Sequence, residues 1–176
     1  NCLIDSWVRK NSNKNFDIDG LFASSGSVNK IILEQGQELF SNRTNQNILS
    51  FDVNDFDVSF VRGLSLVDGA ATLTDFTARI IGTTISSLMV KVNKPCKVMI
   101  CGGGRKNKTL IKAIKSYTEK NISFEPIDKH GINGDFVESQ AFAFIAIRSK
   151  LGLPISFPNT TGCNKPTIGG KITEIK

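Results

Sequence analysis

A run of three glycines, Gly102–Gly104, is the feature of this 176-residue chain best suited to hold a ligand. It follows Val98–Cys101, a continuous apolar run that predicts a strand buried on both faces. Behind the glycines, an amphipathic pattern predicts a helix over about 107–117. Because glycine lets a ligand touch the backbone and a helix N-terminus favours phosphate, the run predicts contact with a nucleotide or another electron-rich group.

Two other interpretations of the glycine run stay open. In the first, Gly102 and Gly104 begin the G-x-G-x-x-G pattern of Rossmann dinucleotide-binding proteins. Glu125 then lies near the end of the next predicted strand, where such proteins bind ribose. Position 107, however, is Asn instead of the third glycine. In the second interpretation, the glycines form a tight structural turn. No Gly-Lys-Ser/Thr follows, so the run is not a Walker P-loop.

A carboxylate, Glu138, is the second candidate. It lies in the first turn of a predicted helix, Asp135–Lys150, that is apolar on nearly every side and is therefore expected to be buried. A carboxylate in such a helix needs a partner, either the amide groups of the helix itself or a hydroxyl group of a ligand. Asp135 is either the cap of this helix or a functional residue. The residues alone leave both choices open.

The charge distribution raises the question of nucleic-acid binding. The net charge is +6, and much of the excess lies between Lys91 and Lys120. A basic stripe of this kind could follow a phosphate backbone. However, Tyr117 is the only aromatic residue in the stripe that could stack on a base, and a solvated helix face explains the lysines equally well. We therefore do not expect nucleic acid as a partner.

Cysteine usage and hydropathy argue against further classes. Four cysteines are scattered without paired spacing and there is one histidine, which argues against a zinc site and against a disulfide framework. No apolar run reaches the ~20 residues that cross a bilayer, and the start of the chain lacks the pattern of a signal peptide. The sequence thus predicts a cytoplasmic protein with no zinc site, no residue assigned as a metal ligand and no membrane partner.

The predicted elements run as helices first, and then as alternating strands and helices. The longest helix opens at Ser65, with Asp68 completing a capping pair. Together with the strand before the glycines, strands at Ile122–Pro126 and Lys171–Ile175 predict a parallel α/β layer. Three strands are few for so many helices, so we expect the sheet to be incomplete. Leu3–Trp7 has the pattern of the middle of a helix, which predicts that the chain begins inside a longer sequence.

Motifs in a specific order and spacing run along essentially the whole chain. They are Asn1–Trp7, Phe16–Gly20, Asp68–Ala78, Cys101–Gly104 with Asn107, Gly134–Asp135 with Glu138 and Ala141–Ala143, and Thr161–Gly162. In this order they resemble the C-terminal part of anhydro-N-acetylmuramic acid kinases, a family of the actin-like, hexokinase-like ATPase superfamily. The resemblance implies that residues 1–176 form a single nucleotide- and sugar-binding lobe. That lobe would have an actin-like, ribonuclease H-like fold, with a partly parallel sheet flanked by helices.

The resemblance also implies a reaction. Members of that family use ATP and Mg²⁺ to phosphorylate O6 of 1,6-anhydro-N-acetylmuramic acid while a water opens the anhydro bridge at C1. The product, N-acetylmuramic acid 6-phosphate, belongs to the recycling of cell-wall peptidoglycan. The residues implied on the adenosine side are Gly102, Gly103, Gly104 and Asn107. Those implied on the sugar side are Glu138, Thr161 and Gly162.

Two parts of the family pattern do not occur in this sequence. They are a Gly-Thr-Ser-x-Asp-Gly phosphate loop and the water-activating aspartate, which lie upstream in the family. Phosphoryl transfer depends on positioning by both lobes, so we expect the chain alone to be inactive and assign it no catalytic residue. The expected partners are the sugar and the missing N-terminal half, with a homodimer or aggregation as the expected state of the isolated chain. A catalytically dead remnant or binding module of the same fold is the first alternative, and a basic nucleic-acid-binding domain that uses the Lys91–Lys120 stripe is the second.

Overall fold

The computed structural model describes residues 2–43, 56–89 and 94–173, which divide into two compact units. The first, which we call the helical unit, spans Asn1–Pro126, and the second, the C-terminal unit, spans Ile127–Lys176. The glycine run lies in the helical unit, and Glu138 lies in the C-terminal unit. That the two units work as a single lobe stays a prediction.

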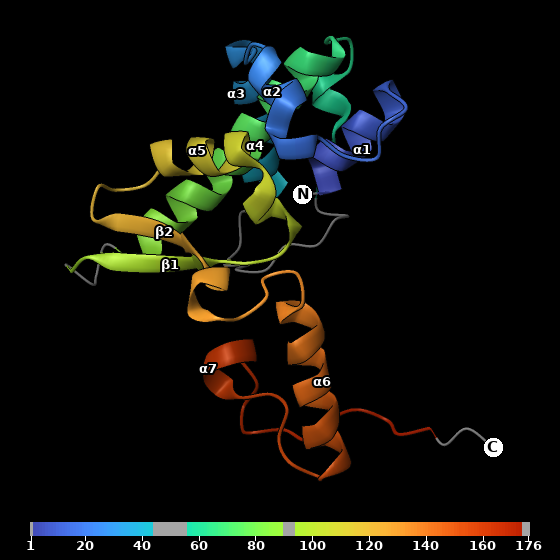
Figure 1. Ribbon diagram of the computed structural model, residues 1–176, viewed down its shortest axis with the longest axis vertical. Helices are drawn as coiled ribbons and strands as arrows, with labels where there is room; N and C mark the ends of the chain where they lie inside the picture. The colour runs from blue at the N-terminus through green and yellow to red at the C-terminus, as the bar shows by residue number, and fades with distance from the viewer. Residues whose placement is uncertain (1, 44–55, 90–93, 174–176) are drawn as a thin grey trace. The chain divides into compact units, whose positions relative to one another are not determined.

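In its described residues, the helical unit consists of helices with a pair of strands along one side (Figure 1). Helix α4 contacts each of the other α-helices of this unit and is therefore its scaffold. The α-helices are α1 (Cys2–Asn11), α2 (Leu21–Ser25), α3 (Lys30–Arg43), α4 (Leu66–Met89) and α5 (Lys108–Ser116). The 3-10 helices are η1 (Ile18–Gly20), η3 (Ser59–Val61) and η4 (Gly103–Lys106).

The start of α4 is the predicted capping pair, which is confirmed. Ser65 Oγ accepts a hydrogen bond from the Asp68 backbone N–H at 3.1 Å and donates one to an Asp68 carboxylate oxygen at 2.7 Å. The Asp68 carboxylate also accepts from the backbone N–H of Ser27 at 2.8 Å, which ties the segment before α3 to α4. These bonds, the one from Ser27 most of all, hold the pKa of Asp68 below its ordinary value of 3.8.

Helix α1 packs on α4 through Trp7. The indole N–H donates to the carbonyl oxygen of Leu66 at 2.9 Å, and the ring occupies the space where a Cβ of residue 69 would lie. Gly69 lowers the helix propensity of α4 but permits this close approach of the two helices. The buried residues around the contact form the main core: Ile4, Trp7, Val8, Ala23, Val61, Ala70 and Leu73.

Strands β1 (Cys96–Ile100) and β2 (Ile122–Pro126) form a parallel pair, and α5 lies between them in the chain. Leu110 and Ile114 of α5 pack with Phe124 of β2, so α5 covers the strands from one side. The predicted parallel strand–helix–strand arrangement is confirmed. The predicted strand at 171–175 is wrong for 171–173, which form no strand, and the rest of it lies outside the described residues.

Strand β1 is not buried on both faces, and that prediction is wrong. Val98 and Ile100 are half-buried, whereas Lys97 is exposed and Met99 is 44% exposed. The cause is that the helices of this unit lie on one side of the two strands (Figure 1). Apolar Met99 on the open side gives the run a uniformly apolar pattern although the strand is covered on one face only.

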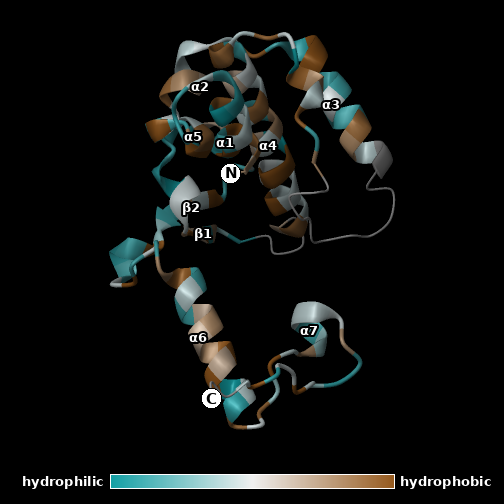
Figure 2. Ribbon diagram, turned by 90° about the vertical axis from the view of Figure 1, so that its right-hand side faces the viewer, coloured by the Kyte–Doolittle hydropathy of each residue, from teal (hydrophilic) through white to brown (hydrophobic). Residues whose placement is uncertain are grey.

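The C-terminal unit is built around one long helix. Its elements are η5 (Ile127–His130), α6 (Val137–Lys150), α7 (Pro158–Thr161) and an antiparallel bridge between Ser156 and Thr167. The predicted burial of α6 is wrong: Phe142 and Phe144 are 64% and 60% exposed, and no residue of the helix is buried. Figure 2 shows apolar residues along the length of α6. Apolar patterning requires cover, and the described residues of the C-terminal unit do not provide it.

Candidate functional site

The glycine run forms an open loop between β1 and α5. Gly102 has φ 72° and ψ 176°, a conformation that side chains with a Cβ rarely adopt. A Cβ built on Gly102 or Gly103 would meet no atom within 4 Å, so space beside the loop is free for another molecule. The side chain of Arg105 fixes the first residue, because its Nη1 donates to the carbonyl oxygen of Gly102 at 2.9 Å.

Asn107 joins the loop to α5 as the N-cap of that helix. Its Oδ1 accepts from the backbone N–H of Leu110 at 2.8 Å, and its own N–H donates to the carbonyl oxygen of Gly104 at 3.1 Å. An N-cap of this kind contributes about 1 kcal/mol to helix stability. The side-chain oxygen of Asn107, a residue that the resemblance implies on the adenosine side, is therefore already used by the helix.

A pocket of about 370 Å³ lies against the loop. Its volume lies within the range of ~300–1,000 Å³ typical of small-molecule sites. The first residues of the chain form one wall, and the glycine loop with the start of α5 forms the other. The lining residues are Ile4, Asp5, Phe16, Asp17, Asp19, Gly103, Gly104, Lys106, Asn107 and Leu110. The wall opposite the glycines is thus rich in carboxylates.

The segment 16–20 of that wall was singled out in the sequence only as a motif, without a role. Asp17 is 4% exposed and accepts from the backbone N–H groups of Phe22 at 2.7 Å and Ala23 at 3.1 Å. It therefore holds the start of α2. Asp19 is exposed and has φ 54°, a left-handed conformation that Asp tolerates better than most residues. No sequence signal placed either carboxylate beside the glycines, because more than 80 positions separate the two segments along the chain.

In the structure, the acidic residue on which the Rossmann interpretation depends does not line the pocket beside the glycines. Glu125 on β2 forms an ion pair with Lys97 on β1 at 2.7 Å, between the side chains of adjacent strands. It is not among the residues that line the pocket beside the glycines. A ribose at this loop would therefore not meet Glu125, and the geometry favours the other nucleotide interpretation.

The sugar-side candidates lie in the C-terminal unit. Glu138 is exposed in the first turn of α6. Helix α6 begins at Val137, so Phe136 occupies the cap position and Asp135 lies one residue before it. Both interpretations of Asp135, as a cap and as a functional residue, stay predictions.

Thr161 and Gly162 lie at the end of α7. Gly162 ends the helix with φ 70°, and its N–H donates to the carbonyl oxygen of Pro158 at 3.0 Å. The hydroxyl group of Thr161 contacts that of Ser156, and hydrogen bonding by Thr161 is the largest influence holding the pKa of the nearby Cys163 thiol below its ordinary value. A sugar contact by Glu138, Thr161 or Gly162 stays a prediction.

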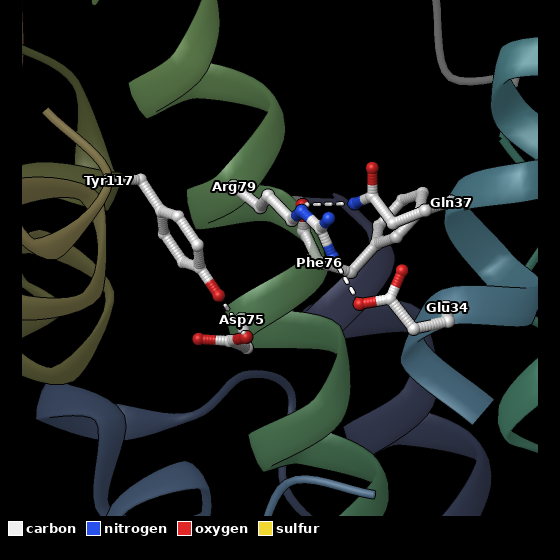
Figure 3. A network of polar contacts seen from close by, with 6 residues as sticks. All are labelled: Glu34, Gln37, Asp75, Phe76, Arg79 and Tyr117. Atoms are coloured by element: carbon white, nitrogen blue, oxygen red, sulfur yellow. Dashed lines mark hydrogen bonds and ion pairs between the residues drawn. The ribbon is translucent and has the colours of Figure 1, made fainter. Parts of the chain in front are cut away.

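Polar contacts from Asp75 and Arg79 of α4 link this helix to the end of α5 on one side and to α3 on the other (Figure 3). The Tyr117 hydroxyl donates to an Asp75 carboxylate oxygen at 2.6 Å, and Arg79 forms an ion pair with Glu34 at 2.6 Å. Burial, followed by the hydrogen bond to Asp75, raises the pKa of Tyr117 to about 12. The network fixes the C-terminal end of the helix whose N-terminal end carries the glycine loop.

The described residues contain neither a metal-binding cluster nor a membrane-spanning helix. Within 2–43, 56–89 and 94–173, no group of three or more His, Cys, Asp or Glu side chains is arranged to hold a metal ion. In the same ranges, no helix has both the length and the apolarity needed to span a bilayer.

Comparison with known proteins identifies the family to which the chain belongs. A family model described as anhydro-N-acetylmuramic acid kinase matches residues 1–175. Proteins of that name are similar throughout the chain. The chain belongs to the anhydro-N-acetylmuramic acid kinase family, and the resemblance drawn from its motifs is confirmed.

Three curated relatives with this name illustrate the similarity. That of Pelagibacter ubique is 47% identical over 99% of this chain and 47% of its own length. That of Zymomonas mobilis is 37% identical over 98% of the chain and 46% of its own length. That of Rhizorhabdus wittichii is 40% identical over 97% of the chain and 45% of its own length. The chain thus spans about half the length of the curated relatives it matches.

Proposed function

We propose that this chain is the nucleotide-binding C-terminal half of a cytoplasmic kinase that transfers phosphate from ATP to O6 of 1,6-anhydro-N-acetylmuramic acid. The reaction would yield N-acetylmuramic acid 6-phosphate for peptidoglycan recycling. Family membership supports the reaction class. The observation that carries the proposal is the pocket of about 370 Å³ whose wall is a glycine loop at the N-terminus of α5.

The loop would hold the adenosine side of the nucleotide, as the resemblance implies. Gly103 has open space where a side chain would be, so a ligand can approach its backbone. The phosphates would lie toward Lys106 and the helix N-terminus, because the opposite wall carries the carboxylates of Asp5, Asp17 and Asp19, which repel them. ATP supplies the phosphoryl group when it is bound. The loop binds and orients the ATP molecule. We propose no residue of 2–43, 56–89 or 94–173 as a ligand of Mg²⁺.

The sugar would meet the C-terminal unit. Glu138 is an exposed carboxylate at the start of a helix, and a sugar hydroxyl is the partner that suits it. Thr161 and Gly162 offer a hydroxyl group and an exposed backbone near the end of α7. We propose that these three residues bind and orient the sugar and that they do not take part in proton transfer.

The remaining half of the protein would complete this one. The open face of β1 with Met99 and the exposed apolar residues of α6, such as Phe142 and Phe144, are surfaces that need cover. The matched relatives are about twice as long as this chain, and the additional length would supply that cover. We further propose that the two halves together form an actin-like fold and that this half alone does not turn over substrate.

Isothermal titration calorimetry with ATP tests the nucleotide site. The chain should bind ATP weakly, because half of the phosphate clamp is elsewhere. Gly103→Ala and Gly103→Val add one and then three carbons to the open space and should weaken binding progressively. Neither should unfold the chain, since a Cβ at Gly103 meets no atom within 4 Å. Equal ATP affinity in the wild type and Gly103→Val would show that the loop is only a turn.

A further inference from the structure

The pocket beside the glycine loop has two walls that are joined directly to each other. Thr109 lies in the first turn of α5, and its hydroxyl group donates to the carbonyl oxygen of Gly20 at 2.9 Å. The two residues are 89 positions apart in the sequence. This bond connects the segment that carries Asp17 and Asp19 to the helix that follows the glycines.

Gly20 is shaped for this contact. Its φ is 78°, in the left-handed region that favours glycine. A Cβ at this position would overlap the Oδ1 atom of Asn107 and lie 2.6 Å from the Cβ atom of Thr109. The turn therefore lies directly against the cap of α5, with no room between them for one additional methyl group.

The contact extends into the loop itself through Asn107. The same Oδ1 atom that adjoins Gly20 accepts the capping bond from Leu110, and the Asn107 N–H donates to Gly104 at 3.1 Å. A movement of Gly20 therefore displaces the Asn107 side chain, and with it the last turn of the loop. The chain of contacts runs from Gly20 through Asn107 to Gly104.

We infer that Thr109 and Gly20 are positioning residues for the ligand loop, which hold its two pocket walls at a constant separation. On this account Asn107 acts on a nucleotide through the position of the loop and not by touching it. The effect on ATP binding rests on the proposed function. The effect on the order of the loop does not, because it follows from the contacts alone.

Hydrogen–deuterium exchange of the loop amides, measured on the full chain without ligand, is the first test. Thr109→Val keeps the shape of the side chain and removes the donor, so the amides of Arg105 and Asn107 should exchange about fivefold faster. Thr109→Ser retains a hydroxyl group and should restore most of the protection. Thr118→Val is the matched control, because the Thr118 hydroxyl group donates to the Lys115 carbonyl oxygen at 3.0 Å near the other end of α5.

The second readout is ATP affinity by calorimetry, which should also fall about fivefold in Thr109→Val and stay unchanged in the control. Global unfolding followed by the fluorescence of Trp7 should be similar in the two valine variants. Loop exchange in Thr109→Val equal to that of the control overturns the positioning role, whether or not ATP binds. Faster loop exchange in Thr109→Val, together with a wild-type chain that binds no ATP, supports the positioning role and overturns the nucleotide assignment instead.

Discussion

The hydroxyl group of Tyr117 donates a hydrogen bond to the carboxylate of Asp75 at 2.6 Å, joining the end of α5 to the middle of α4. Tyr117 is the only tyrosine of the chain, so its ionisation can be followed without overlap. Burial and then Asp75 raise its pKa from an ordinary 10.0 to about 12. This contact fixes one end of the helix whose other end carries the ligand loop.

The first prediction concerns the titration of Tyr117. Tyrosinate absorbance of the folded chain should rise around pH 12, and in Asp75→Asn the transition should move to lower pH because the negative charge is gone. It should stay above 10.0, since burial, the larger cause, remains. Folding raises this pKa, so the contribution to stability is complete below pH 10.0 and is lost as the pH rises through about 12. A wild-type midpoint near 10.0 in the folded chain would contradict the contact.

The second prediction concerns the approach of α1 to α4. Gly69→Ala places a methyl group where the Trp7 ring lies and should lower the free energy of unfolding by about 1–3 kcal/mol. Denaturant unfolding followed by Trp7 fluorescence measures the change. Gly104→Ala is the control, because its Cβ would meet the nearest atom, of Leu110, only at 4.0 Å. Equal free energies of unfolding for Gly69→Ala and Gly104→Ala would mean that α1 can move away from α4 without loss of stability, which would contradict the close packing of Trp7 on Gly69.

Several of these relationships could be predicted from the sequence, and the reasons are local. The Ser65–Asp68 cap, the long helix behind it and the parallel pair of strands follow from residue type and spacing. Glycines after an apolar run correctly marked the loop between β1 and α5. Local patterns of this kind are decided by neighbours within a few residues.

The wrong or missed predictions concern residues whose burial or contacts depend on a segment far away in the sequence. The apolar patterns of β1 and α6 predicted burial, yet Met99 and Phe142 are exposed because no described element of their own unit covers them. The carboxylates at Asp17 and Asp19 were not connected to the glycines, since the connection depends on the bond between Thr109 and Gly20. The period of the hydrophobic pattern and the secondary-structure propensity of the residues do not reveal which distant segment a loop will contact.

The third prediction is a pH dependence at the start of α4. The hydrogen bond from Ser27 and that with Ser65 lower the pKa of Asp68, so its contribution to stability is fully present above 3.8. This contribution is lost as the pH falls from 3.8 through the lower pKa that Asp68 has in the folded chain. The melting temperature of Asp68→Asn should therefore lie below that of the wild type at neutral pH, and the difference should narrow on acidification. A difference that stays constant into strong acid would contradict the assignment.

The fourth prediction concerns association of the isolated chain. Light scattering at micromolar concentration should detect species larger than a monomer, because the exposed apolar residues of α6 are without cover. The double variant Phe142→Ser/Phe144→Ser should form smaller amounts of these larger species. Ile31→Ser, which removes a 74% exposed side chain from α3, is the control and should leave association unchanged. A wild-type chain that is entirely monomeric would show that these surfaces need no partner.

The central claim, that this chain is the nucleotide-binding half of a sugar kinase, is tested most directly by a chimera. The chimera replaces the matching part of the Pelagibacter ubique relative, which is 47% identical, with this chain. Phosphorylation of 1,6-anhydro-N-acetylmuramic acid is then measured for the chimera, for the chimera carrying Gly103→Val, and for the chain alone. We predict ATP-dependent product from the chimera, strongly reduced product from the Gly103→Val chimera, and none from the chain alone. A folded chimera without activity, or product from the chain alone well above background, would contradict the account.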